Sequence, residues 1–178
     1  MQYDDALRRA IEESEKETFE LAALEQRCIA EPQNAVAHFA LAEVLALRGR
    51  FAEAAKAYHA ALTCNPNYIE ALVGLGLVEL QRGEIVSAVE ALSKAAALSP
   101  QSAEIHFYLG NALDDAGKNE EAIKAFETAL DLKPDYEEVH LALGFLYYRI
   151  GNQKGVREQY RVLQALQSPL AEQLARLL

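Results

Sequence analysis

Apolar residues recur along most of the chain at the spacing of amphipathic helices. Between residues 103 and 132 the repeating positions are Leu109, Leu113, Ile123, Phe126 and Leu130. Within each half of this stretch they stand three or four residues apart, which places them on one face of a helix. Ala, Leu and Glu, all good helix formers, are abundant. The pattern predicts an all-α protein.

The helical pattern itself repeats every 34 residues. Four columns keep this interval: Leu41, Leu75, Leu109 and Leu143; Gly49, Gly83, Gly117 and Gly151; Ala54, Ala88 and Ala122, with Val156 in the fourth place; and Pro32, Pro66, Pro100 and Pro134. Agreement of four columns in one phase indicates an array of equal structural units.

Each column has a physical role in a pair of helices. The glycine suits the turn between the two helices, where the chain adopts a positive φ. The proline ends the second helix, since it has no N–H to donate. The polar residues after it are expected to cap the next helix; they are Asn67, Ser102 and Asp135. Because helices of this length are only marginally stable alone, we expect neighbouring pairs to stack and share a core.

The residues of these units resemble the tetratricopeptide repeat (TPR). The third unit matches it at Leu109-Gly110, Leu113, Ala122, Phe126, Ala129 and Pro134; the first at Leu41-Ala42, Ala54, Tyr58, Ala61 and Pro66; the second at Leu75-Gly76, Ala88, Leu92, Ala95 and Pro100; and the fourth at Leu143-Gly144 and Tyr160. The fourth unit departs from the pattern, with Val156 in the small-residue column and its proline displaced to Pro169. The column that holds Trp in the family contains His38, Leu72, His106 and His140.

The resemblance covers about three quarters of the chain. It implies a right-handed α-α superhelix, the TPR solenoid, with four full helix-turn-helix repeats. Their expected bounds are 35–68, 69–102, 103–136 and 137–168. We expect the whole chain, residues 1–178, to form a single TPR domain.

The segment before the first repeat, residues 1–34, follows the pattern only in part. It matches at Leu24 and Pro32, but Glu15 stands where the turn glycine should be. Two interpretations remain open: a degenerate helix pair with a break near residues 14–16, or one long N-terminal capping helix.

The segment after the last repeat, residues 169–178, is expected to form a C-terminal capping helix. Ser168 and Pro169 fit an N-cap followed by proline in the first turn. A short amphipathic helix here would cover the last repeat, as terminal repeats require. The final Leu177-Leu178 leaves open a longer array or a self-association patch.

Composition and charge narrow the class of partner. The chain of 178 residues is 51% apolar and carries a formal net charge of −10. That charge disfavours nucleic acid and anionic membranes, whose phosphates would be repelled. A protein or peptide partner with an amphipathic or basic segment fits better. The charged N-terminus has no apolar signal core, so we expect a cytoplasmic protein, although a signal removed earlier would leave the same sequence.

The residues that often carry chemistry form no recognisable site. Cys28 and Cys64 are far apart and belong to no CxxC motif, so neither a disulfide framework nor a zinc site is predicted. Three histidines occupy one column of successive repeats, namely His38, His106 and His140, and are expected to pack between helices. His59 is expected to be exposed. Gly74, Gly76 and Gly83 lie within a helical pattern and its turn, with no preceding strand, so no phosphate loop is predicted. We therefore expect no enzymatic activity, no metal and no cofactor.

One face of each repeat's first helix carries large side chains that point away from the second helix. By helical period Leu109, Gly110 and Leu113 face the second helix, whereas Phe107, Asn111 and Asp114 lie nearly opposite. In TPR proteins the first helices line a concave groove, so the resemblance implies that this face binds a partner. The candidate residues are Phe39, Glu43, Val73, Leu77, Phe107, Tyr108, Asn111, Asp114, Leu141, Phe145 and Tyr148. The alternative is packing against the first helix of the next repeat, above all for Val73 and Leu141.

Three glutamates, Glu70, Glu104 and Glu138, recur in phase near the start of the first helices. There they stabilise the helix dipole, and they also suit an acidic lip that selects basic residues of a ligand. The face does not resemble the carboxylate clamp of some TPR domains, because only Asn111 and Arg149 are of the required types.

The primary hypothesis is an interaction module or scaffold that holds a segment of another protein. Two alternatives are a small acidic TPR chaperone for a secreted or assembling partner, and a structural protein that forms homo-oligomers through the ends of the solenoid.

Overall fold

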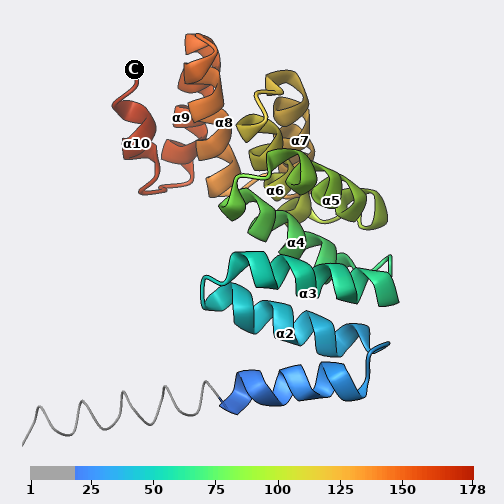
Figure 1. Cartoon of the computed structure of the whole chain (residues 1–178). Coiled ribbons are helices and arrows are strands. Elements are labelled where there is room, and N and C mark those ends of the chain that lie inside the picture. Colours follow the sequence, from blue (N-terminus) through green and yellow to red (C-terminus); the bar gives the residue numbers. More distant parts are fainter. Residues whose placement is uncertain (1–18) are drawn as a thin grey trace, which may run out of the picture. The chain divides into compact units, whose positions relative to one another are not determined.

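The computed structural model describes residues 19–178, and all regular secondary structure within them is helical (Figure 1). Residues 19–30 are helical, and the helices that follow are α2 Ala35–Leu47, α3 Phe51–Cys64, α4 Ile69–Arg82, α5 Ile85–Leu98, α6 Ala103–Asp115, α7 Asn119–Leu132, α8 Glu137–Arg149, α9 Gln153–Ala165 and α10 Ala171–Ala175. The chain forms two compact units, the first ending at Arg82 and the second beginning at Gly83.

The first unit contains α2, α3 and α4 after the helical residues 19–30. Helix α3 packs against both α2 and α4, and α2 also contacts α4. Small residues of α2 and α3 are wholly enclosed: Ala37, Ala42, Ala54 and Ala61 are all 0% exposed. Their size lets the two helices pack closely, as the small-residue column predicts.

The second unit runs from α5 to α10, and its consecutive helices pack in pairs from α5·α6 to α9·α10. One core cluster lies between α6, α7 and α8 and includes Leu113, Ala122, Phe126, Val139 and Leu146. A second cluster joins α9 to the short α10 through Leu163, Ala171 and Leu174. Helix α10 therefore covers α8 and α9 as a C-terminal cap.

The turn glycines adopt the backbone conformation that the sequence predicts. Their φ angles are +71° at Gly49 and Gly117 and +77° at Gly83 and Gly151. After α9 a non-glycine residue takes this conformation, because Gln167 has a φ of 57°. The chain thus ends α9 with the usual left-handed residue although glycine is absent there.

The helix caps follow the sequence only in part. Ser102 caps α6 by accepting from the N–H of Ile105 at 3.3 Å, as predicted. Asp135 does not cap α8, because the N-cap position is Tyr136, whose side chain makes no capping bond. Asn34, which was not among the predicted caps, caps α2 by accepting from the N–H groups of two residues of its first turn.

Ser168 tethers the C-terminal cap instead of serving as its N-cap. The N-cap position of α10 is Leu170, whose N–H donates to Ser168 Oγ at 3.2 Å. The Ser168 hydroxyl in turn donates to Glu137 Oε2 at 2.5 Å, at the start of α8. This bond joins the segment after α9 to the first turn of α8.

The histidine column makes a recurring hydrogen bond. Nε2 of His38, His106 and His140 lies 3.1, 3.1 and 2.9 Å from the carbonyl oxygen of the proline six residues earlier. His140 is buried, and its Nδ1 lies 2.7 Å from the side-chain amide of Gln159. The ring therefore fastens α2, α6 and α8 to the loop before each of them, in addition to packing, whereas α4 has Leu72 in this column and lacks the bond.

The start of the chain is described only from residue 19. Residues 19–30 form one helical stretch that ends before Pro32, and Leu21 and Cys28 are its buried apolar residues. The predicted break near residues 14–16 lies outside the described residues.

We expect Ala122→Leu to lower the free energy of unfolding by about 1–3 kcal/mol, because a larger side chain overpacks a fully enclosed site. Ala122 is 0% exposed in the α6–α8 core. Thermal or urea unfolding followed by circular dichroism measures the change. Ala97→Leu, at an exposed position of α5, is the control and should stay within about 0.5 kcal/mol of wild type. Equal stability of the two variants would contradict the packing described.

Candidate partner-binding site

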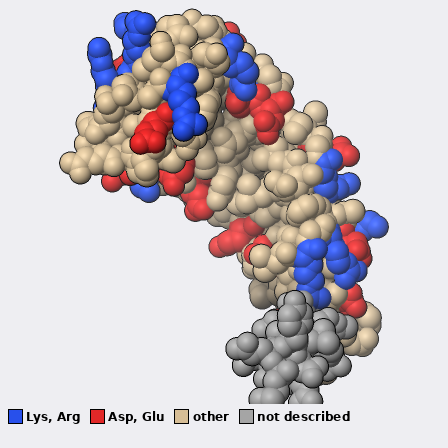
Figure 2. All heavy atoms as spheres, turned by 90° about the vertical axis from the view of Figure 1, so that its left-hand side faces the viewer, with Lys and Arg blue, Asp and Glu red and all other residues tan. Residues whose placement is uncertain are grey.

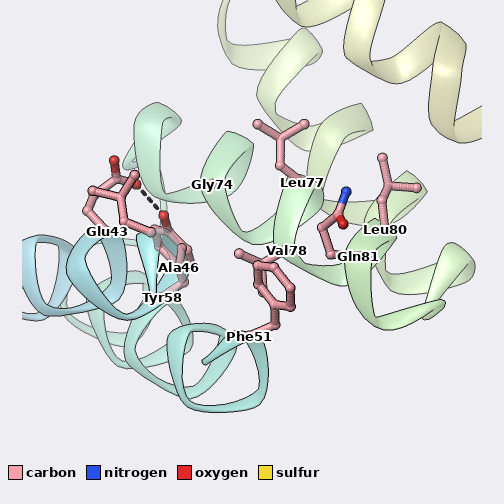
Figure 3. A pocket seen from close by; sticks show the side chains of 10 residues that line it. Glu43, Ala46, Phe51, Tyr58, Gly74, Leu77, Val78, Leu80 and Gln81 are labelled. Carbon is pink, nitrogen blue, oxygen red and sulfur yellow. Dashed lines mark hydrogen bonds between the residues drawn. The ribbon is translucent and has the colours of Figure 1, made fainter. Parts of the chain in front are cut away.

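In the first unit, side chains from three helices surround an open pocket of about 400 Å³ (Figure 3). The lining residues are Glu43, Ala46 and Leu47 of α2, Phe51 and Tyr58 of α3, and Gly74, Leu77, Val78, Leu80 and Gln81 of α4. The walls are predominantly apolar, and the polar groups are a carboxylate, a phenol and an amide. Apolar walls with a few placed polar groups are typical of ligand pockets.

A glycine on α4 leaves the space that the ring of Tyr58, a residue of the pocket lining, occupies. A Cβ atom on Gly74 would lie 2.6 Å from Cε1 of Tyr58, too close for any real contact. The same column of the other repeats holds Ala40, Tyr108 and Ala142. Since Tyr58 is only 1% exposed, its ring has no room to move aside. Gly74 is therefore required for the position of Tyr58 and for the hollow beside it.

The phenol of Tyr58 fixes the acidic group at the pocket wall. Its hydroxyl donates to Glu43 Oε1, the dashed line in Figure 3. Burial raises the pKa of Tyr58 far above its ordinary range, and the bond to Glu43 raises it further. The phenol is thus a permanent donor, while Glu43 itself is exposed at the pocket.

An aromatic group supports the pocket beside this bond. The Phe39 ring lies 6.0 Å from Tyr58 and 5.0 Å from Tyr68, measured between ring centroids. Phe39 is partly buried, and its contacts with Tyr58 and Tyr68 hold a cluster of three aromatic rings beside the Tyr58 phenol.

In the second unit, Phe107 is more enclosed than the helical period predicts. Its ring centroid lies 5.4 Å from that of Tyr136 and 6.3 Å from that of Phe126, which belongs to the second helix α7. The expectation that Phe107 points away from the second helix is therefore wrong. A long side chain on a helix leans over the preceding turn, and the Phe107 ring is thereby able to reach α7.

The exposed apolar residues of this face lie at the end of α8. Phe145 is 40% exposed and Tyr148 is 47% exposed. Leu141, one helical turn earlier, instead packs against the core cluster of α9 and α10. Asp114 forms an ion pair with Arg149, so its charge is matched within the unit.

The three recurring glutamates lie exposed in the first turns of α4, α6 and α8, as predicted. Glu104 accepts a hydrogen bond from the Tyr108 hydroxyl at 3.0 Å. Burial, followed by this bond, raises the pKa of Tyr108 to about 12. Burial also raises the pKa of Tyr136, with further contributions from Glu104 and Glu138.

The structure brings only some of the predicted residues together. Glu43 and Leu77 line the pocket of the first unit. Sequence reasoning missed Tyr58 and Gly74 as pocket residues. The signal for Gly74 was present, because it is the only glycine in its column.

Two descriptions of one sequence family match the chain. "Tetratricopeptide repeat" matches residues 35–68, and "TPR repeat" matches residues 76–115 and 110–151. These matches cover more than half of the chain. The protein belongs to the tetratricopeptide-repeat family.

Solved TPR structures share the fold. MamA, residues 41 to the end, from Desulfovibrio magneticus RS-1 is 24% identical with a TM-score of 0.81, and 93% of each chain is covered. MamA AMB-1 is 26% identical with a TM-score of 0.77, covering 87% of this chain and 92% of that one. YrrB, described as a TPR protein with an unusual peptide-binding site, is 19% identical with a TM-score of 0.81, covering 94% and 88%. No curated protein sequence matches the chain.

Two other kinds of site are absent from the part of the chain that the structure describes. Within residues 19–178 no three His, Cys, Asp or Glu side chains are grouped to hold a metal ion. None of the helices there is both long and apolar enough to cross a membrane.

We expect Gly74→Ala to destabilise the protein by about 1–3 kcal/mol, because the added methyl group collides with the enclosed Tyr58 ring. The overlap should outweigh the gain in helix propensity, which is about 1 kcal/mol. Urea unfolding of the single variants and of Gly74→Ala combined with Tyr58→Leu forms a double-mutant cycle. The cost of Gly74→Ala should shrink when the ring is absent. An undiminished cost would show that Tyr58 is not the obstacle.

The raised pKa of Tyr108 predicts that the protein loses stability at alkaline pH. Its pKa is raised from 10.0 to about 12, so the folded state favours the neutral phenol. The resulting stabilisation is complete below pH 10 and is lost as the pH rises towards about 12. Tyr108→Phe should therefore reduce the fall in unfolding free energy between about pH 9 and about pH 11, measured by urea unfolding. An unchanged slope would contradict this environment for Tyr108.

Proposed function

We propose that this TPR protein holds an amphipathic segment of a partner protein in the pocket between α2, α3 and α4. The TPR fold supports a protein-interaction scaffold in general terms. The observation that carries the specific proposal is the apolar pocket of about 400 Å³ with the Tyr58–Glu43 pair in its wall.

The pocket suits an apolar side chain of the partner. Leu77 and Leu80 are partly exposed, and Leu47 at the same pocket is 87% exposed. Covering these side chains removes apolar surface from water, at about 25 cal/mol for each Å². The hollow behind them is already formed, so a ligand side chain enters without displacing Tyr58.

The acidic groups around the pocket favour basic residues of the partner next to that apolar side chain. Glu43 is held at the pocket, and Glu70 is exposed in the first turn of α4. The net charge of −10 attracts a basic segment at longer range. On the face drawn in Figure 2, charged groups are separated by wide uncharged areas, which leaves room for apolar contacts.

The likeness to YrrB supports a peptide as the ligand, because that protein has a peptide-binding site and shares the fold. In the second unit, Phe145 and Tyr148 of α8 are exposed and form a separate apolar surface for a partner. Their binding role, the chaperone and homo-oligomer alternatives, and the cytoplasmic location stay predictions.

Selection from a random peptide library against the purified protein tests the proposal. Selected peptides should be rich in apolar residues flanked by Lys or Arg. Leu77→Glu should weaken their binding at least about tenfold in fluorescence anisotropy, since a charge then lines the pocket. Val86→Glu is the matched control, because Val86 is 73% exposed on α5 and does not line the pocket.

Equal loss of binding in the two variants, or selection of peptides without an apolar anchor, would contradict the proposal. Circular dichroism of both variants confirms that they are folded before binding is compared. Light scattering over a range of protein concentrations tests the homo-oligomer alternative separately.

A further inference from the structure

The outer face of α9 carries an unpaired basic stripe, defined here as Lys154, Arg157 and Arg161. Their spacing of three and four residues places them on one side of the helix. All three are exposed, whereas Val156 and Leu163 on the other side are 0% exposed. The packed side of α9 holds the helix in the unit and presents the stripe to solvent.

The stripe lines a shallow hollow of about 440 Å³ together with Glu158. Although Glu158 lies between these basic residues in the sequence, it forms no ion pair with them within 4.0 Å. Across residues 19–178, none of the five ion pairs involves Lys154, Arg157 or Arg161. No ion pair within the described residues therefore holds these side chains, and Glu158, which lies on the same face, offsets only part of their positive charge.

The corresponding positions of the preceding repeat show that folding does not demand this charge. One repeat earlier, on α7, Glu120 and Glu127 stand in the columns of Lys154 and Arg161. A glutamate in the first turn of a helix is favourable to the helix dipole, whereas Lys154 in the first turn of α9 is unfavourable. At Lys154 and Arg161 the charge is thus the reverse of that on α7, and at Lys154 it also opposes the helix dipole; in the other two columns Ile123 stands for Arg157 and Lys124 for Glu158.

The reversal belongs to a wider change of charge near the C-terminus. Residues 149–178 contain five Lys or Arg and only two Glu, in a chain of net charge −10. The stripe is consequently a local basic surface on an acidic protein.

We propose that the basic stripe of α9 binds an acidic segment of a partner protein, with carboxylates at helical spacing. The stripe extends about 10 Å along the helix, which matches two turns of a helical ligand. A short acidic segment meets only the stripe. A nucleic acid would run past it onto a protein of negative net charge, which repels a long polyanion. The inference is independent of the pocket in the first unit.

A synthetic Ala-rich helical peptide, fluorescently labelled and carrying glutamates at spacings of three and four, is the probe. Fluorescence anisotropy measures its binding to the full chain at low and at physiological salt. Lys154→Glu combined with Arg161→Glu should weaken binding about tenfold or more, since two attractive contacts become repulsive. These substitutions copy the residues of α7, so the variant should remain folded.

The control is Lys94→Glu combined with Lys124→Glu, which makes the same change of net charge at exposed positions of α5 and α7. It should change affinity less than about threefold, because it alters only the long-range field. A peptide with glutamine in place of glutamate should not bind. Equal weakening by both double variants would overturn the proposal.

Three further outcomes would also overturn it. These are tighter binding of a single-stranded oligonucleotide than of the peptide, tighter binding of phosphatidylserine vesicles, and self-association of the wild type that the stripe variant abolishes. The first two identify a phosphate ligand and the third a second copy of the chain. Loss of binding of the library-selected peptides by the Leu77→Glu variant tests the pocket and does not bear on the stripe.

Discussion

Close packing of small side chains between paired helices is the constraint on which the structure depends. Helices of 13 or 14 residues, such as α2 and α3, are marginal alone, so each must bury one side against a neighbour. Ala54 and Ala122 are wholly enclosed because the facing helix backbones come close. That distance fixes which residues reach the core and which stay on the outer surfaces. The candidate sites lie where this packing leaves side chains exposed or a space between helices unfilled.

The pocket of the first unit shows how one departure from the repeat becomes a site. Where other repeats place Ala40, Tyr108 or Ala142, α4 has Gly74, and the Tyr58 ring occupies the missing volume. The ring carries its hydroxyl to Glu43, so a substitution that serves packing also positions a charged group. Packing and recognition therefore share the same residues here.

The repeat columns predicted the helices and their turns, since periodicity and glycine conformation are local properties of the chain. They did not predict how Phe107 contacts Phe126, because the direction of a long side chain depends on neighbours distant in sequence. The N-cap of α8 was also predicted one residue too early. Asp135 was expected there, but Tyr136 occupies the position. Gly74 could have been recognised as exceptional, but the ring that fills its space is known only from the fold.

Outer surfaces are the part of a repeat that stability constrains least. The α7 and α9 faces occupy equivalent positions, yet one carries Glu127 and the other Arg161. Both helices bury their opposite sides completely, at Ala122 and Val156 respectively. Since either sign of charge is compatible with the same packed helix, the core does not determine which one is present. The positive charge at Lys154, which is unfavourable to the helix dipole, is therefore not a requirement of the packed helix and is compatible with the acidic partner proposed for this face.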